Sequence, residues 1–479
     1  MYMERTKQAA CTLLCIVPLI AGTEVAAQQP AAETSRIDVI CPKNVALLHV
    51  LVSLTPTGLQ RAEYINHPLA AEAREHFAAF AGHPAVGFTE QLFRQMSYHP
   101  MHYLALMYSE FPEAREVRQL PDYLPMDEGS RAMLVRYVGL VREFYEASGF
   151  AAFWSARESR IAAILDTARA NIRTVELPRI MEEFYGREAG RFFFVTSPFM
   201  QEAGFHAELL EDGRLDFYYF SGGRTYANEL YYNYIAFHEL SHSFIEPISV
   251  QFSTRIDSLS HLYRPLAERF RRLGYPNWDR AFNEHMVTAG QFHLTRLVFG
   301  EEQAMEMVER EKVRGFQLIE RFYGLFAEYS ESRDEYESLA EFYPVILEDL
   351  ATLQVEEYRE PDVMGFYPRF DESGVVVDRV VEGSAFAQAG IEAGDLLVSV
   401  GEEAIDSEET FGAAKAHCWS AAREGDVVDV TVMRNGSDLT FSITIPFTTR
   451  FRYVEREPGP LGAAGRCQRD TWAEHCLPC

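Results

Sequence analysis

The chain has 479 residues, of which 47% are hydrophobic and 13% aromatic, a composition that supports two or three domains with buried cores. Its formal net charge is −27, with 71 acidic residues against 44 basic ones. This acidic balance argues against nucleic acids and anionic membrane surfaces as partners.

The first 27 residues have the pattern of a secretory signal peptide. Arg5 and Lys7 precede an apolar run at residues 9–21, and small residues follow at positions 25–27. The run is too short for a membrane span, and no later stretch is long enough for one. We therefore expect an exported protein, periplasmic or extracellular, that starts at Gln28 and has no membrane span.

The chain has seven cysteines, and five remain after residue 27. An odd number in an exported protein leaves at least one thiol without an intramolecular partner. Cys418 lies on the apolar side of a predicted helix, which favours a buried free thiol there. The other four can form two disulfides in three possible pairings: Cys41, Cys467, Cys476 and Cys479. A metal site in the tail that includes His475 is an alternative for these cysteines.

From about residue 35 to residue 353 the pattern is mostly helical. Apolar residues recur at three- and four-residue spacing in the segments His67–Phe80, Ala132–Ala147, Phe150–Thr174 and Ala304–Tyr329.

One β region interrupts these helices. Three segments are strand-like: Arg191–Thr196, Gly204–Leu210 and Arg214–Phe220. The turn signal Glu211-Asp-Gly213 joins the last two as a hairpin. The exposed edge of this small sheet can pair with an extended substrate, although an ordinary hairpin that closes the core fits the same pattern.

The segment that follows contains a His-Glu-x-x-His motif made by His238, Glu239 and His242. Residues four apart lie on one face of a helix, so the two imidazoles can bind one zinc ion. Zinc lowers the pKa of a water molecule, which becomes the nucleophile of peptide hydrolysis, and Glu239 is the general base. The neighbouring side chains are almost all apolar or aromatic, which indicates a buried helix rather than a surface helix with two incidental histidines.

A catalytic zinc ion keeps three protein ligands and one open position, so a third ligand must come from elsewhere. The best candidate is Glu284, which lies 42 residues after His242 in another apolar helix. Pro247 predicts the end of the motif helix, so we expect the preceding Glu246 to face outwards or to support a ligand. Glu246 and His285 are the alternative third ligands.

The motif and the pair Asn283-Glu284 resemble the gluzincin metalloproteases, whose third ligand often occurs in an Asn-Glu context. That resemblance implies that His238, His242 and Glu284 bind one zinc ion. The chain departs from it at Thr288, where those enzymes often have an aspartate that orients a ligand histidine.

The motif with its flank up to Pro247, together with Gly82-His-Pro-Ala-Val86, is also similar to an uncharacterised family of exported bacterial zinc peptidases. This likeness covers about residues 35–353 and implies a gluzincin-like catalytic domain without a known substrate. That family usually has asparagine where this chain has Glu246, which argues further against a ligand role for Glu246.

Residues 357–446 have a different pattern. The expected elements are the strand Gly374–Val381, the short helix Gly383–Gly390, the strand in Ile391–Val400, the helix Ser407–Arg423 and the hairpin Val427–Ile445 turned by Asn435-Gly436.

The run Gly383-Ser…Ala-Gly-Ile…Gly-Asp-Leu-Leu397 resembles bacterial PDZ domains. PDZ domains usually bind a peptide C-terminus as an added strand and hold its carboxylate on the backbone N–H groups of a loop. The resemblance implies that Met364, Gly365 and Phe366 form this loop, with the strand Gly374–Val381 and the helix from Ser407 framing the groove. A PDZ domain that only packs against the rest of the chain is the alternative.

These observations predict an α+β protein with a mainly helical, zincin-like catalytic domain that contains a small β-sheet, followed by a β-barrel-like PDZ domain. The expected parts are a signal peptide (1–27), a zinc metallopeptidase-like domain (28–355), the PDZ domain (356–450) and a cysteine-containing tail (451–479). We expect one Zn²⁺ ion, a peptide or protein substrate, and a PDZ domain that recruits peptide C-termini. Candidates for stabilising the oxyanion are Tyr218, Tyr219, Tyr226, Tyr231, Tyr232 and His293.

Two other functions fit parts of this pattern. A glycyl-type aminopeptidase with a PDZ domain shares the motif and the domain order, but it needs an N-terminal β-sandwich, which the helical stretch after Ser35 disfavours. A non-catalytic, metal-containing peptide-binding protein is disfavoured by Glu239, because a structural metal site does not use a general base.

Overall fold

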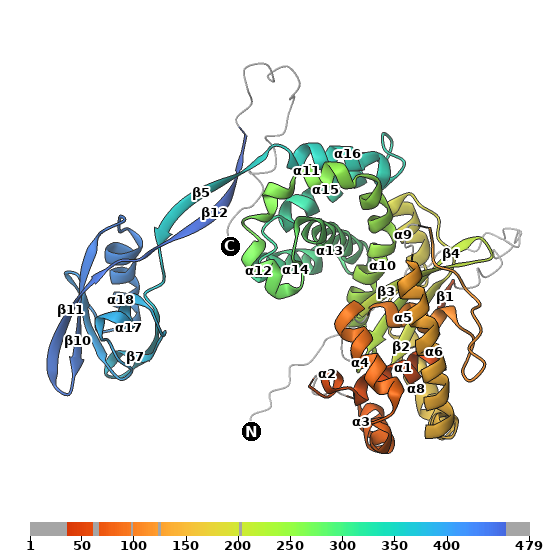
Figure 1. Ribbon diagram of the computed structural model, residues 1–479. Helices are drawn as coiled ribbons and strands as arrows, with labels where there is room; N and C mark the ends of the chain where they lie inside the picture. The colour runs from red at the N-terminus through yellow and green to blue at the C-terminus, as the bar shows by residue number, and fades with distance from the viewer. Residues whose placement is uncertain (1–35, 61–66, 97–98, 123–125, 201–203, 457–479) are drawn as a thin grey trace, which may run out of the picture. The chain divides into compact units, whose positions relative to one another are not determined.

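The computed structural model describes residues 36–60, 67–122 without 97–98, 126–200 and 204–456 (Figure 1). The signal-peptide prediction, Cys467, Cys476, Cys479 and His475 lie outside the described residues. No helix among the described residues is long and apolar enough to cross a membrane. The fold is α+β: a helical part with a small sheet is followed by a β-rich part.

The first part consists of one short strand and a set of helices. Its elements are β1 (Ile37–Ile40), α1 (Lys43–Leu54), α2 (Pro56–Gln60), α3 (Pro68–Phe77), α4 (Pro84–Met96), α5 (His99–Met107), α6 (Glu128–Ser148), α7 (Phe150–Ser155) and α8 (Glu158–Ala170).

The predicted helix Phe150–Thr174 is two helices, α7 and α8, with a break before Arg157. The Arg157 amide donates a hydrogen bond to the carbonyl of Trp154 at 2.8 Å, and its guanidinium donates one to the carbonyl of Phe153 at 2.9 Å. The side chain therefore replaces a helical hydrogen bond, which periodicity alone does not reveal.

A four-stranded sheet in the order β1-β2-β4-β3 precedes the motif helix. Strands β2 (Phe192–Ser197), β3 (Gly204–Glu211) and β4 (Arg214–Gly222) confirm the three predicted strands, and β1 adds a parallel strand that was not predicted. Asp212 and Gly213 have φ values of 51° and 77° and form the turn between β3 and β4. Strand β3 is antiparallel to its neighbour and lies at the edge of the sheet.

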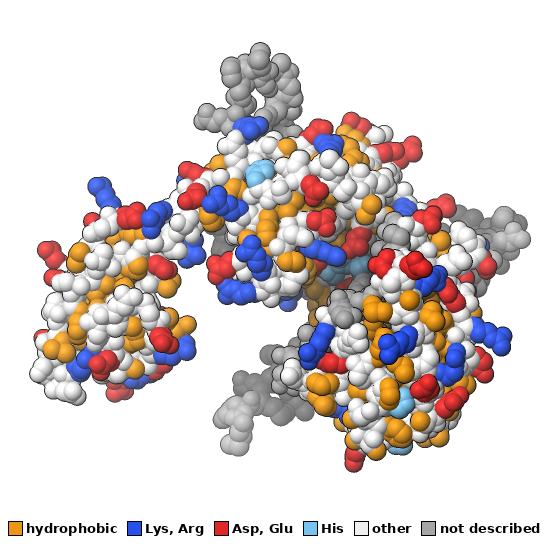
Figure 2. Space-filling view, viewed as in Figure 1, with side chains coloured by type: hydrophobic (Ala, Val, Ile, Leu, Met, Phe, Trp, Pro, Cys, Tyr) orange, Lys and Arg blue, Asp and Glu red, His pale blue; other side chains and the backbone are white. Residues whose placement is uncertain are grey.

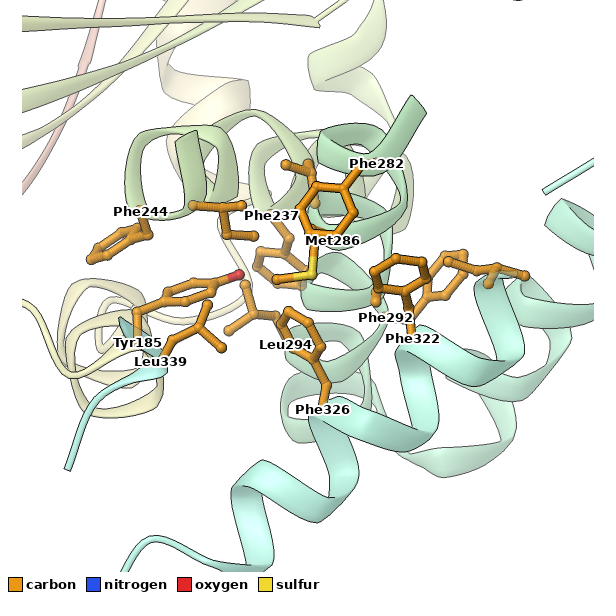
Figure 3. Close-up of a cluster of buried hydrophobic side chains, with 14 of the residues drawn as sticks. Tyr185, Phe237, Phe244, Phe282, Met286, Phe292, Leu294, Phe322, Phe326 and Leu339 are labelled. Atoms are coloured by element: carbon orange, nitrogen blue, oxygen red, sulfur yellow. The ribbon is translucent and has the colours of Figure 1, made fainter. Parts of the chain in front are cut away.

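The second set of helices surrounds the motif. These are α9 (Leu177–Tyr185), α10 (Glu229–Gln251), α11 (Ser253–Ser258), α12 (Ala267–Leu273), α13 (Trp278–Phe299), α14 (Glu301–Arg314), α15 (Ile319–Glu331) and α16 (Leu339–Leu350). Figure 3 shows Phe237 and Phe244 of α10, Phe282 and Met286 of α13 and Phe326 of α15 in one buried cluster. The predicted helix Ala304–Tyr329 is divided because Gly315, at φ 109°, ends α14.

The prediction that Pro247 ends the motif helix is wrong, because α10 continues to Gln251. A proline in a helix leaves the carbonyl four residues before it without its usual donor. Here that carbonyl belongs to Ser243, and the Arg187 guanidinium donates to it at 2.8 Å. An arginine from outside the helix thus satisfies the carbonyl that the proline leaves without a helical donor.

The C-terminal part contains a ribbon and a separate sheet. Strands β5 (Leu353–Pro361) and β12 (Phe447–Glu455) pair antiparallel along their whole length. Between them lie β6 (Phe366–Asp371), β7 (Gly374–Val380), α17 (Ala385–Ala389), β8 (Leu396–Val400), β9 (Glu403–Ala404), α18 (Glu408–Ala414), β10 (Val427–Arg434) and β11 (Ser437–Thr444). The main path of this sheet is β11-β10-β8-β7-β6. Asn435 and Gly436, both at positive φ, form the predicted hairpin turn between β10 and β11.

The predicted helix Ser407–Arg423 changes character after α18. A π-helical turn spans Lys415–Ser420 and adds a residue per turn relative to an α-helix. Trp419 rather than Cys418 therefore takes the inward position, and Trp419 is buried. Cys418 and Cys41 are both free thiols among the described residues, but Cys418 is half-buried and not fully buried as predicted.

Candidate metal centre

The three predicted ligands come together where α10 packs against α13. Glu284 Oε1 lies 3.3 Å from His238 Nε2, and Glu284 Oε2 lies 4.0 Å from His242 Nε2. One ligand atom from each of the three residues lies within 4.8 Å of the other two. The aromatic core under α10 and α13 fixes how these two helices pack, so it sets the separation of the histidines and the carboxylate.

The ring orientations test whether this group fits a metal ion. The planes of His238 and His242 are inclined by 79°, so lone pairs in both planes can meet at one point. Two imidazole nitrogens and one carboxylate oxygen are a donor set that zinc accepts in catalytic sites. The geometry therefore fits a zinc ion, and the ligand roles stay predictions.

A second group of possible ligands, His206, His242 and Glu246, is equally compact. The rings of His206 and His242 are parallel within 8°, and their centres lie 4.4 Å apart. An ion in the plane of one ring would lie well outside the plane of the other, where no lone pair points. This second group does not fit a shared ion.

Each histidine of the motif is oriented through its other ring nitrogen. His238 Nδ1 lies 3.2 Å from Gln291 Oε1, and Gln291 Nε2 donates to the Tyr234 carbonyl at 2.8 Å. His242 Nδ1 lies 3.0 Å from Glu246 Oε1. Such partners hold the proton on Nδ1 and leave Nε2 for a metal. Glu246 therefore supports His242, one of the two places predicted for it.

His285, the other alternative ligand, lies away from the centre. It is fully buried, its Nδ1 lies 2.7 Å from the Ala281 carbonyl, and its ring stacks on Phe270. Its position one residue after Glu284 turns it to another face of α13, towards the aromatic core.

The carboxylates of the centre stay ionised despite their burial. Burial raises the pKa of Glu284, but the charge and hydrogen bond of His238 outweigh it and bring the value down to about 2. The hydrogen bond from His242 likewise outweighs burial at Glu246 and lowers its pKa to about 2. Burial lowers the pKa of His242, yet Glu246 raises it to about 9. The cluster thus favours positive charge between its carboxylates.

The edge strand β3 lies close to Glu239. A Cβ atom on Gly204 would come within 2.6 Å of Glu239 Oε1 and 2.3 Å of Ile235 Cγ2, so only glycine permits this approach. Within the described ranges, the outer edge of β3 makes one β-bridge, between Leu210 and Gln119 at the far end of the strand.

The side chains of the cluster are largely, but not completely, buried. Its six side chains keep between 9% and 28% of their surface exposed: His206, His238, Glu239, His242, Glu246 and Glu284. Figure 2 shows histidine and acidic side chains inside a hollow of the surface.

Four of the predicted oxyanion candidates are engaged elsewhere. Tyr218 stacks on Phe193, and Tyr232 shares a hydrogen bond with Thr196. Tyr226 lies beside His67, and His293 stacks on Phe184 at 4.2 Å.

The other two candidates, Tyr219 and Tyr231, differ in exposure. Tyr219 is fully buried, and burial, with a contribution from the charge of Glu239, raises its pKa. Tyr231 is exposed in the first turn of α10.

Tyr275, which the sequence did not single out, lies at the centre. Burial and the charge of Glu284 raise the pKa of Tyr275, and its hydroxyl forms a hydrogen bond with the Glu284 carboxylate. The charge of Glu239 acts on it as well. His206 and Gln291 were also missed, although Gln291 lies seven residues after Glu284 and so shares its helix face, a spacing that could have indicated it.

The predicted PDZ loop lies at the start of β6. Gly365 has a φ of 83°, and a Cβ atom there would come within 2.3 Å of Ser384. Its carbonyl accepts hydrogen bonds from the Val381 amide and the Ser384 hydroxyl. Among the described residues, no hydrogen bond is donated by the amides of Met364 and Gly365.

The groove strand was predicted wrongly. Strand β7 pairs with β6 on one side and β8 on the other, so it has no free edge. The edge strand is β6, which directly follows the loop. Phe366 and Phe370 of β6 face Phe411 of α18 at ring distances of 5.8 and 6.1 Å.

Comparison with known proteins also separates the helical part of the chain from its C-terminal part. Residues 126–348 match the model of a domain of unknown function, DUF4932, and residues 362–445 match the PDZ domain. No curated protein matches the chain.

Several solved structures are similar to parts of the chain. One is the HtrA3 PDZ domain bound to a phage-derived ligand, at 23% identity, with 20% of this chain and 93% of that chain covered and a TM-score of 0.16. The serine endoprotease from Yersinia pestis is 23% identical over 22% of this chain and 35% of its own, with a TM-score of 0.15. An aminopeptidase N family protein from Idiomarina loihiensis is 13% identical over 63% and 65%, with a TM-score of 0.21.

The chain spans less than two thirds of the last two proteins, and TM-scores this low support no argument from them. The predicted metal ligands all lie within the DUF4932 match, to which no function is attached. The C-terminal part of the chain is a PDZ domain.

Proposed function

We propose that the protein is an exported, zinc-dependent peptidase whose PDZ domain recruits peptide C-termini. The observation that carries this proposal is the convergence of His238, His242 and Glu284 on one point, with Glu239 beside them and the edge of a sheet alongside. A purely structural metal site would not need an uncoordinated carboxylate beside the ion, nor the edge of a sheet next to it.

The residues of the chain have distinct parts in this proposal. A zinc ion held by His238, His242 and Glu284 would polarise the scissile carbonyl and lower the pKa of water. Glu239 accepts the proton of the attacking water and passes it to the leaving amine. The backbone of β3 near Gly204 pairs with the extended substrate and orients it. Tyr275 is our candidate for donating a hydrogen bond to the oxygen on which negative charge develops.

A metal analysis combined with a turnover assay tests this function. The chain purified from Gln28 onward is expected to contain about one zinc ion and to cleave members of a fluorogenic peptide library. A chelator should abolish cleavage, and added zinc should restore it. Zinc without turnover would support the non-catalytic alternative, whereas cleavage confined to free N-termini would indicate an aminopeptidase. A metal-free protein that retains turnover would refute the proposal.

The PDZ part of the proposal predicts preference for a free C-terminus. A peptide with an apolar last residue should bind the full-length mature protein through the amides of Met364 and Gly365 and the edge of β6. Amidating that residue should weaken binding roughly 10- to 150-fold, because a hydrogen bond to a charged group contributes about 1.5–3 kcal/mol. Fluorescence anisotropy with both peptide forms measures the ratio.

A matched pair of variants locates the groove. Phe370→Ala removes a ring that faces Phe411. Tyr367→Ala removes another ring of the same strand, β6, but this ring lies under the guanidinium of Arg379. Only Phe370→Ala should weaken binding. If the free and amidated peptides bind equally well, or if neither binds, the PDZ domain is used for packing alone.

A further inference from the structure

Strand β3 carries a histidine that neither the motif nor the proposed zinc ligands include. His206 is buried, and its ring stacks on His242. It lies two residues after Gly204, on the strand that the proposed function assigns to substrate binding.

The two ring nitrogens of His206 face two different carboxylates. His206 Nδ1 lies 3.6 Å from Glu239 Oε2, and His206 Nε2 lies 3.9 Å from Glu246 Oε2. Glu239 is the proposed base, and Glu246 orients His242. One imidazole therefore lies between the proposed base and the carboxylate that orients His242, with one ring nitrogen towards each.

We propose that His206 is a positioning residue that holds the carboxylates of Glu239 and Glu246 in place from the edge strand. This inference rests on the proposed peptidase function. The ring of His206 packs flat against that of His242, and its two nitrogens face the carboxylates on either side. Because His206 belongs to β3, a substrate that pairs with β3 acts on the same strand that holds the base.

Buried packing alone does not explain a histidine here. An imidazole between two ionised carboxylates costs free energy unless it is paired with them, and an apolar residue would fill the same space without that cost. The parallel stacking on His242 excludes a shared ion as the reason for the imidazole. Holding the two carboxylates is the role that remains.

Two substitutions of His206 test the proposal in the full mature chain. His206→Ala is expected to keep one zinc ion, to lower kcat about 10- to 100-fold and to leave KM nearly unchanged, as for other residues that orient a metal site. His206→Gln keeps a hydrogen-bond donor towards Glu239 and should recover part of the loss. His293→Ala is the matched control, because it removes another buried imidazole that stacks on Phe184, away from the centre.

A spectroscopic measurement makes the test independent of turnover. In the cobalt-substituted protein, His206→Ala should shift the visible absorption bands, since the support of His242 changes, whereas His293→Ala should not. An unchanged spectrum together with an unchanged kcat would overturn the positioning role, and so would loss of the metal, which would make His206 a ligand. If the wild-type zinc protein cleaves no peptide, a shifted spectrum still supports the role of His206, and only the peptidase proposal fails.

Discussion

Glu239→Gln is expected to lower peptide turnover about 10²- to 10⁴-fold while the protein keeps one zinc ion per chain. Glutamine has nearly the shape of glutamate and keeps an oxygen for His206, but it cannot accept a proton from water. The loss should therefore appear in kcat and not in metal content. Atomic absorption and a fluorogenic peptide assay on the same preparation measure both quantities.

The control for this substitution is Glu229→Gln in the first turn of the same helix. Glu229 is exposed and pairs with Arg173 at the surface, so its loss should change neither quantity. If Glu239→Gln cleaves peptides at the wild-type rate, Glu239 is not the base. If it loses zinc, Glu239 is a ligand and the assignment of Glu284 must be revised.

A second large effect is expected on zinc affinity from Glu284→Gln. Structural sites in small domains bind Zn²⁺ with a free energy of about 10–16 kcal/mol, so each of three ligands contributes several kcal/mol. Loss of one ligand should therefore weaken zinc binding on the order of 10³-fold. The carboxylate of Glu284 lies beside Nε2 of both histidines, which is where the ion would bind. Competition with a chromophoric chelator measures the dissociation constant.

Glu246→Gln provides the contrast within the same cluster. Glu246 faces Nδ1 of His242, so its substitution should weaken zinc binding only about 10- to 100-fold. The melting temperature should rise with added zinc in wild type and in Glu246→Gln, but hardly in Glu284→Gln. The opposite order of affinities would show that Glu246 is the third ligand.

The sequence singled out the residues of the candidate metal centre because they follow helical spacing. His238, Glu239 and His242 are fixed by one helix, and Glu284 was found because it lies within an apolar helix after an asparagine. The three strands before the motif alternate clearly and end at turn residues, so their bounds were predicted within two residues. The ligand roles themselves stay predictions until a metal is measured.

The residues that sequence analysis did not identify reach the cluster only through tertiary contacts. His206 and Tyr275 stand alone in their segments, and only the packing of β3 and of the chain before α13 brings them to the centre. The same reason explains the wrong end of α10: Arg187 lies sixty residues before Pro247 along the chain, and no local pattern links it to the Ser243 carbonyl. The π-helical turn at Lys415–Ser420 likewise breaks the periodicity from which Cys418 was predicted to be buried.

The ribbon of β5 and β12 has a consequence for how the PDZ domain is attached. Pro361 and Phe447 are register partners at the end of the ribbon, so the domain between them takes the place of a hairpin loop. At its other end the ribbon is anchored by Tyr453, whose hydroxyl donates to the Leu262 carbonyl at 2.7 Å. Partner residues of paired strands lie about 5 Å apart, a gap that a two-residue turn closes. An Asn-Gly turn in place of residues 362–446 would turn the ribbon into a plain hairpin, so this architecture allows a whole domain to be gained or lost as a single insertion between two paired strands.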